Sequence, residues 1–219
     1  MTFHSSTLFS GLAKNEINAI KEAAVRLSIE ASRIIVRANE TADRLFLIET
    51  GTVDYEVSTE DGREILLRRL GVGDVFGVAS FLSKPIGYLG TAKAVQHITV
   101  LEWQARVIRQ LAKTYPLLVE NALRTALRYL ALYAKRHIAL VSNTSQERLA
   151  WALSSLGSRT GHPVPNGVEV DIKNEDLASL ADVGLFTASR ILQDWDRHKV
   201  VEKSRGKVII RSPEKLLAA

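Results

Sequence analysis

The chain has 219 residues, of which 46% are hydrophobic, and this length and composition allow two domains with buried cores. Its net charge of +5 and isoelectric point near 9.5 suit a polyanionic partner, but the excess is too small to identify one. The absence of cysteine excludes disulfides, thiol-based redox sensing, cysteine zinc sites and cysteine-ligated iron–sulfur clusters.

The beginning of the chain has no secretory leader, and no uninterrupted apolar run reaches the ~18 residues that a membrane span needs. We therefore expect a cytoplasmic protein without a membrane partner. Residues 8–22 predict a short helical lead-in. From Arg33 to Leu101, short β-branched runs alternate with turn residues, and Asp61-Gly62 predicts a hairpin turn. This spacing is typical of an antiparallel β-roll or barrel.

A long helix is predicted from Tyr115-Pro116 onward, because proline is favoured in the first turn of a helix. Its apolar positions alternate in steps of three and four, as in the seam of a coiled coil. The seam residues are Leu123, Leu127, Leu130, Ala134, His137 and Val141. This seam predicts a parallel homodimer, and the alternative is a single helix packed on the β-roll. The basic side chains off the seam are expected to face solvent. They are Arg124, Arg128, Lys135 and Arg136.

The polar run at residues 142–145 ends this helix and offers N-caps for the next one, so it is predicted to be the hinge between domains. We expect an N-terminal β-roll domain at residues 1–113, a dimerisation helix at 114–142 and a separate C-terminal domain at 143–219. After a helix that starts at Arg148, residues 157–167 are predicted to form a loop that leads to a strand at 168–172.

The segment from residue 173 to residue 197 has the pattern of a helix-turn-helix. The first helix is predicted to begin at Asn174 as its N-cap and to end at the turn Asp182-Val183-Gly184. The second helix is predicted from Phe186 to Arg197. Its apolar side chains are expected to face the core, namely Ala188, Ile191, Leu192 and Trp195.

The outward face of this second helix and the hairpin after it are predicted to bind double-stranded DNA. Arg190 has the geometry to donate two hydrogen bonds to a guanine, and Thr187 and Ser189 carry hydroxyls suited to bases or phosphates. Residues 190–211 carry a net charge of +4 and form two β-rich runs around a glycine turn. The basic side chains expected on phosphates are Lys203, Arg205 and Lys207.

These parts together resemble the Crp/Fnr family of bacterial transcription regulators, over nearly the whole chain. The matching runs are ETGTV at 49–53, GVGDVFG at 71–77 and TASRIL at 187–192. The resemblance implies an α+β fold. It would combine an N-terminal antiparallel β-roll of the cyclic-nucleotide-binding type, a long dimerisation helix and a C-terminal winged helix-turn-helix. It also implies RNA polymerase as a partner if the protein is an activator.

Two departures from the family pattern change what the resemblance predicts. Cyclic-nucleotide-binding members carry a glutamate for the ribose and an Arg-Ser pair for the cyclic phosphate, and this chain has Val78 and Tyr88-Leu89 at those positions. A buried phosphate needs charge-assisted donors, so we expect no binding of cyclic AMP. Fnr-like members have a glutamate where Phe186 stands, and Phe186 is expected either to touch a thymine methyl group or to pack locally.

The effector pocket of the β-roll is expected to be apolar. The candidate lining residues are Val78, Phe81, Tyr88, Leu89, Tyr129 and Tyr133. They predict a collapsed core without a cofactor, or else a site for a small apolar effector or haem. For haem the candidate ligands are His4, His97 and His137, although a lone histidine is more often structural.

Two other classes of function fit the sequence less well than a DNA-binding regulator. A metal-dependent enzyme on the β-roll would need clustered histidine and carboxylate ligands, and the five histidines are scattered along the chain. The sequence also contains no phosphate-binding loop and no nucleophile elbow. A regulatory module that does not bind DNA is disfavoured by Ser189-Arg190 and the basic hairpin. We therefore predict a regulator that is not an enzyme and binds no metal.

Overall fold

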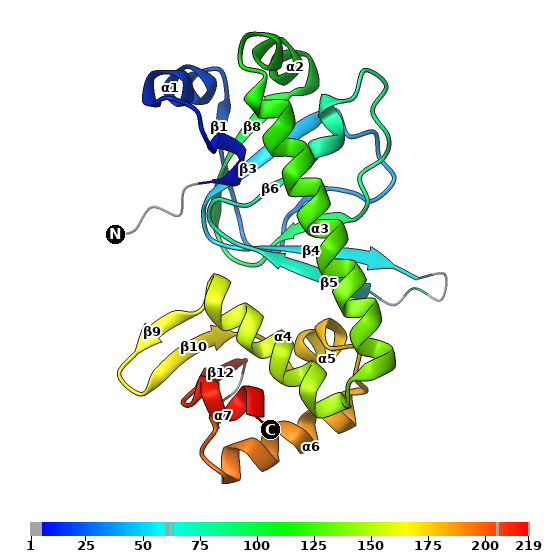
Figure 1. Ribbon diagram of the computed structural model, residues 1–219, viewed down its shortest axis with the longest axis vertical. Helices are drawn as coiled ribbons and strands as arrows, with labels where there is room; N and C mark the ends of the chain where they lie inside the picture. The colour runs from blue at the N-terminus through cyan, green and yellow to red at the C-terminus, as the bar shows by residue number, and fades with distance from the viewer. Residues whose placement is uncertain (1–5, 60–61, 63, 205, 219) are drawn as a thin grey trace. The chain divides into compact units, whose positions relative to one another are not determined.

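The computed structural model describes residues 6–59, 62, 64–204 and 206–218, and its elements are shown in Figure 1. The chain divides into two compact units. The first comprises Met1–Val57 and Arg69–Tyr133, and the second comprises Ser58–Arg68 and Ala134–Ala219.

Two four-stranded sheets form the β-roll that the sequence predicted. Their strand orders are β1-β8-β3-β6 and β2-β7-β4-β5, with antiparallel pairing between β3 and β8 and between β4 and β7. The strands are β1 (Val25–Ile29), β2 (Ile34–Val36), β3 (Arg44–Thr50), β4 (Val53–Ser58), β5 (Glu64–Leu70), β6 (Val75–Phe76), β7 (Thr91–Ala94) and β8 (Ile98–Gln104). Strand β1 lies before the predicted range, and it pairs with β8.

Strand β3 is buried on both faces, and alternate residues along it therefore enter two different cores. Phe46 and Ile48 point into the interior of the roll, where the rings of Phe46 and Phe76 stack with centroids 4.8 Å apart. Leu45 and Leu47 face the other way, into a second cluster that includes residues of the N-terminal helix α1 (Lys14–Glu22) and of α2 (Ala105–Thr114). The roll is thus packed on the outside as well as the inside.

Helical segments accompany the roll in the first unit. They are η1 (Thr7–Phe9), α1 (Lys14–Glu22), η2 (Val78–Phe81), α2 (Ala105–Thr114) and the first part of α3 (Leu117–Ser142). Helix α2 was not predicted. It buries Ala105, Ile108 and Ala112, which lie three, four and seven residues apart, so the helical period was present in the sequence.

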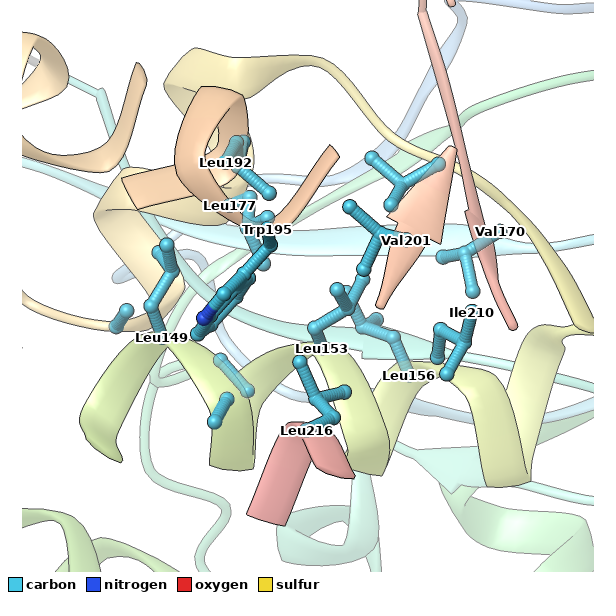
Figure 2. Packing of buried hydrophobic residues seen from close by; sticks show 14 of the residues in the cluster. Leu149, Leu153, Leu156, Val170, Leu177, Leu192, Trp195, Val201, Ile210 and Leu216 are labelled. Carbon is cyan, nitrogen blue, oxygen red and sulfur yellow. The ribbon is translucent and has the colours of Figure 1, made fainter. Parts of the chain in front are cut away.

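The second unit contains a winged helix-turn-helix with one apolar core (Figure 2). Its elements are α4 (Ser145–Thr160), β9 (His162–Val164), β10 (Gly167–Asp171), α5 (Asn174–Leu180), α6 (Leu185–Arg197), β11 (Val201–Ser204), β12 (Lys207–Ile210) and α7 (Pro213–Ala218). The sheet order is β11-β12-β10-β9. Trp195 and Leu192 of α6 pack with Leu149 and Leu153 of α4, so burial against α4 positions the second helix of the motif.

Helix α4 corrects one expectation, because it continues through Gly157 to Thr160 where a loop was predicted. A Cβ atom at Gly157 would lie 2.7 Å from Cδ1 of Ile210. Glycine at this position therefore allows the helix to approach β12 closely, and it does not mark the end of the helix. The predicted loop also contains the short strand β9.

Within the described residues, no helix is both long enough and apolar enough to cross a membrane.

Candidate nucleic-acid interface

Helix α5 supports the helix that follows it. It buries Leu177 and Ala178, and its N-cap is Lys173, which makes no side-chain capping bond. Asn174, which was predicted as the N-cap, is instead the first helical residue. Its side-chain Nδ2 donates to the hydroxyl of Ser189 across 3.3 Å. The side chain of Asn174 therefore links the two helices of the motif.

The turn between α5 and α6 is held by two arginines. Asp182 adopts a φ of 51°, a left-handed conformation that aspartate tolerates better than most residues. Arg148 donates to the carbonyl oxygens of Ala181 and Asp182, each across 3.1 Å. Arg136 Nη2 lies 2.9 Å from the carboxylate of Asp182. Cationic donors at the C-terminal end of α5 also complement its helix dipole, so this turn is well fixed.

Arg136 was expected to face solvent, and that expectation is wrong. Its side chain is 12% exposed because it reaches Asp182 and the carbonyl oxygen of Ser179. The sequence period places Arg136 off the coiled-coil seam correctly. It does not reveal an acceptor that lies 46 residues further along the chain.

Helix α6 has one buried face and one open face. Ala188, Leu192 and Trp195 are buried at the spacing of a helical stripe. The opposite side is exposed, and its residues include Phe186, Arg190, Gln193 and Arg197. Phe186 is 91% exposed, which excludes the expectation that it packs locally. The open face thus presents one guanidinium and one aromatic ring within a single helical turn.

The two hydroxyl residues of the predicted contact set are partly buried. Thr187 and Ser189 flank the buried Ala188, and both are half-exposed. The hydroxyl of Ser189 accepts a hydrogen bond from Asn174, so its own proton is free to be donated outward. Ser189 therefore keeps a hydroxyl proton that it can donate to a ligand.

The hairpin of β11 and β12 follows α6 directly, as predicted. Lys203 is half-buried, and its backbone N–H donates to the carboxylate of Asp196 across 3.3 Å, which ties the hairpin to the end of α6. Lys207 is ion-paired to Glu169 at 2.6 Å and to Asp171 at 3.4 Å, and the hydrogen bond to Glu169 raises the pKa of Lys207. Arg205 lies outside the described residues.

The two lysines of this hairpin therefore differ in what they offer to a phosphate. The charge of Lys207 is matched by two carboxylates, so a phosphate would have to compete with both of them. Lys203 carries no such carboxylate pair among its contacts in the described structure. The basic run in the sequence therefore overstates the positive charge of this surface.

The six residues predicted for an effector pocket are divided among the two cores of the first unit, helix α3 and the surface. Val78 and Phe81 pack against the cluster outside the roll, whereas Tyr88 belongs to the cluster inside it. Leu89 is 73% exposed. Tyr129 donates from its hydroxyl to the carbonyl of Val75 across 2.9 Å. Tyr133 is half-buried on α3.

Tyr55, which sequence reasoning missed, lies against the loop that contains Gly90. The Gly90 N–H donates to the hydroxyl of Tyr55 across 3.0 Å. A Cβ atom on Gly90 would lie 2.9 Å from the ring of Tyr55, so the ring lies directly against the loop. Burial raises the pKa of Tyr55 to about 12, and the nearby Tyr133 adds to the shift. The sequence could have revealed Tyr55, because it lies two residues after Val53 on β4 and alternate residues of a strand face the same side. Here that side is the interior of the roll.

Tyr88 is also fully engaged within the protein. Its hydroxyl donates to the carbonyl of Arg44 and accepts from the N–H of Arg44, each across 3.2 Å. Its side chain is 3% exposed. Tyr88 is therefore part of the core, and its hydroxyl points at the backbone of β3.

Two of the three histidines considered for haem are described, and both lie at the surface. His97 is exposed, and its Nε2 lies 2.8 Å from the hydroxyl of Ser28. His137 is exposed on α3, and His4 lies outside the described residues. Across residues 6–59, 62, 64–204 and 206–218, no group of three or more histidines and carboxylates is placed to hold a metal ion.

Helix α3 has two distinct faces. One is buried on the first unit, where Asn121 donates to the carbonyl oxygens of Leu8 and Ser10 across 3.0 and 2.8 Å. All six predicted seam residues are exposed on the other face, including Leu130 at 64% and Val141 at 84%. The seam thus remains uncovered within a single chain, over the whole length that the heptad pattern spans.

Comparison with known proteins adds to this geometry. The sequence matches the family model of the cyclic nucleotide-binding domain over residues 26–115 and that of the Crp-like helix-turn-helix domain over residues 147–219. It is 24% identical over 211 residues to a CRP-like cAMP-activated global transcriptional regulator of Mycobacterium tuberculosis, covering 95% of this chain and 94% of that protein.

The cyclic AMP receptor protein of Thermus thermophilus is 27% identical over 207 residues, covering 94% of this chain and 93% of that protein. Among solved structures, the c-di-GMP responsive global regulator CLP of Xanthomonas campestris superposes with a TM-score of 0.77 at 16% identity. That match covers 90% of this chain and 99% of the other.

Proposed function

Because this chain belongs to the Crp/Fnr family of DNA-binding transcription regulators, we propose that its contacts to DNA come from α6 and the hairpin after it. Phe186, Thr187, Ser189 and Arg190 would meet base edges and nearby phosphates in the major groove, with Arg190 donating to a guanine. Lys203, Arg205 and Lys207 would approach phosphates. The observation that carries this proposal is the open face of α6, since its opposite face is anchored by Leu192 and Trp195.

The protein acts as a homodimer on a palindromic operator in this proposal. The exposed seam of Leu123, Leu127, Leu130, Ala134, His137 and Val141 supports it, because the spacing of three and four is that of two parallel helices in contact. A two-fold symmetric dimer presents two copies of α6, and such dimers read half-sites that lie about one helical turn apart.

The β-roll does not respond to cyclic AMP in this proposal. An anionic cyclic phosphate in a β-roll requires charge-assisted donors, and the cassette at residues 77–90 contains one cation, the exposed Lys84. The Gly90 N–H already has an acceptor in Tyr55, and the hydroxyl of Tyr88 is used by Arg44. Calorimetric titration of the full chain with cyclic AMP should give no binding heat, and micromolar binding would contradict this part.

The place of action follows from the partners. A regulator of this type meets its DNA and, when it is an activator, RNA polymerase in the cytoplasm, which is where we place the protein. The geometry gives no support to a metal-dependent enzyme on the β-roll, because no metal-ligating cluster is present within the described residues.

The DNA contacts are tested by a mobility shift on duplexes selected from a random pool. Arg190→Ala should lower the preference for the selected duplex over random duplex by about ten-fold or more, since one bidentate contact is worth about 1–3 kcal/mol. Lys203→Ala should weaken binding to both duplexes equally and reduce the slope of log affinity against log salt concentration by about one per half-site, and so by about two for the dimer. Equal affinities for wild type and both variants would exclude this docking.

A further inference from the structure

Phe186 has the largest exposed fraction among the exposed large apolar side chains of the described residues. It is 91% exposed, whereas the preceding Leu185 is 41% exposed. An aromatic ring in water is unfavourable, and nearly all of this ring remains uncovered in its own chain. The ring therefore contributes almost nothing to the stability of the winged unit, so its replacement should not disturb the fold.

The position of Phe186 decides what the ring meets on DNA. It is the second residue of α6, four residues before Arg190, and residues with that separation lie on the same face of a helix. The N-terminal residues of such a helix are the ones that contact base edges in the major groove. A ring at this place faces bases together with Arg190.

The chemistry of the ring then limits which feature of a base it recognises. Phenylalanine has no hydrogen-bond donor or acceptor, so it does not distinguish the polar patterns of base edges. The apolar group on those edges is the C5 methyl of thymine. We infer that Phe186 is a specificity-determining residue that reads a pyrimidine C5 methyl group in each half-site, an inference that rests on the proposed binding of α6 in the major groove.

Contact with a C5 methyl group is not restricted to thymine. A 5-methylcytosine carries the same methyl group at the same place in the groove, and the ring has no polar atom with which to reject cytosine. Phe186 should therefore accept thymine and 5-methylcytosine alike and disfavour uracil and unmethylated cytosine. Methylation of a cytosine at this position would strengthen the binding of the regulator.

The test uses the full-length protein and the duplex that it selects from a random pool. Each thymine of the half-site is replaced in turn by deoxyuridine, in both half-sites, which removes only the methyl group. We expect one position at which wild-type binding weakens about four-fold per half-site, and so about fifteen-fold in total, as for loss of one buried methyl group. At that position, 5-methylcytosine should bind about ten-fold more tightly than cytosine.

Two variants identify the side chain responsible. Phe186→Ala should bind the thymine and deoxyuridine duplexes equally, within about two-fold, while Leu185→Ala should keep the wild-type difference. Unchanged melting temperatures would show that both variants are folded. The inference is overturned if no thymine depends on its methyl group, or if the dependence persists in Phe186→Ala or disappears in Leu185→Ala. Failure of the wild type to select any duplex would instead contradict the proposed function.

Discussion

Replacing Leu130 by alanine tests the proposed dimer seam, and the exposure of this side chain allows the loss of dimerisation free energy to be estimated. Leu130 is 64% exposed in the single chain, and full burial of a leucine side chain is worth about 1.5–3 kcal/mol. Covering the exposed two-thirds would contribute about 1–2 kcal/mol per chain, or about 2–4 kcal/mol per symmetric dimer. At 1.4 kcal/mol per factor of ten, Leu130→Ala should weaken dimerisation roughly 30- to 700-fold.

Sedimentation equilibrium of the purified full-length protein measures this loss. Alanine is a good helix former, so the variant should retain α3 and change only the association. Lys135→Ala is the matched control, because Lys135 is exposed on the same helix and lies off the seam. The reasoning would be refuted if Leu130→Ala associated as tightly as wild type, or if Lys135→Ala weakened association to the same extent.

Three further predictions concern buried or half-buried side chains that stabilise the fold of their own unit. Tyr55→Phe removes the acceptor of the Gly90 N–H, and the unpaired donor should lower the free energy of unfolding by about 1–3 kcal/mol in urea titrations. Because the pKa of Tyr55 is about 12 in the folded protein and that of an unfolded tyrosine is about 10, the folded state holds the proton more tightly. Wild-type stability should therefore fall between about pH 10 and 12, and it should fall less in Tyr55→Phe; equal pH profiles would contradict this. Arg148→Ala leaves the carbonyls at the end of α5 without their cationic donor, and it should destabilise the winged unit by about 2–4 kcal/mol and weaken operator binding. Unaltered melting and binding would show that the turn does not need Arg148. Asp54→Asn breaks a buried ion pair in which two nitrogens of Arg69 lie 2.6 and 2.8 Å from the carboxylate oxygens. The free energy of unfolding should fall by about 3–5 kcal/mol. A decrease below about 1 kcal/mol would contradict a stabilising role for this pair.

Local sequence patterns were sufficient for much of the fold. The helical period predicted both ends of α6 within one residue, and the two β-branched runs after it predicted β11 and β12, although β11 continues three residues past its predicted run. Short-range packing on one core decides these elements. Helix α4 was predicted to stop at Gly157, since glycine usually disfavours a helix. At Gly157 the close packing of Ile210 against the helix outweighs the low helix propensity of glycine. Local sequence patterns do not predict such a contact with a strand far along the chain.

The candidate site was less predictable, since its decisive contacts join residues far apart in the chain. Tyr55 meets Gly90 across 35 positions, and Lys207 meets Glu169 across 38. The first contact involves a tyrosine that the motif did not suggest, and the second reduces the charge that Lys207 offers to DNA. Exposure alone decided between the two interpretations of Phe186, and no local pattern carries that information.

The most direct test of a dimeric regulator that reads DNA through α6 is footprinting on the duplex selected from a random pool. The account predicts a two-fold symmetric footprint whose half-sites lie about ten base pairs apart, protected by wild type and lost with Arg190→Ala. A single asymmetric footprint, or an undiminished symmetric one with Arg190→Ala, would contradict it.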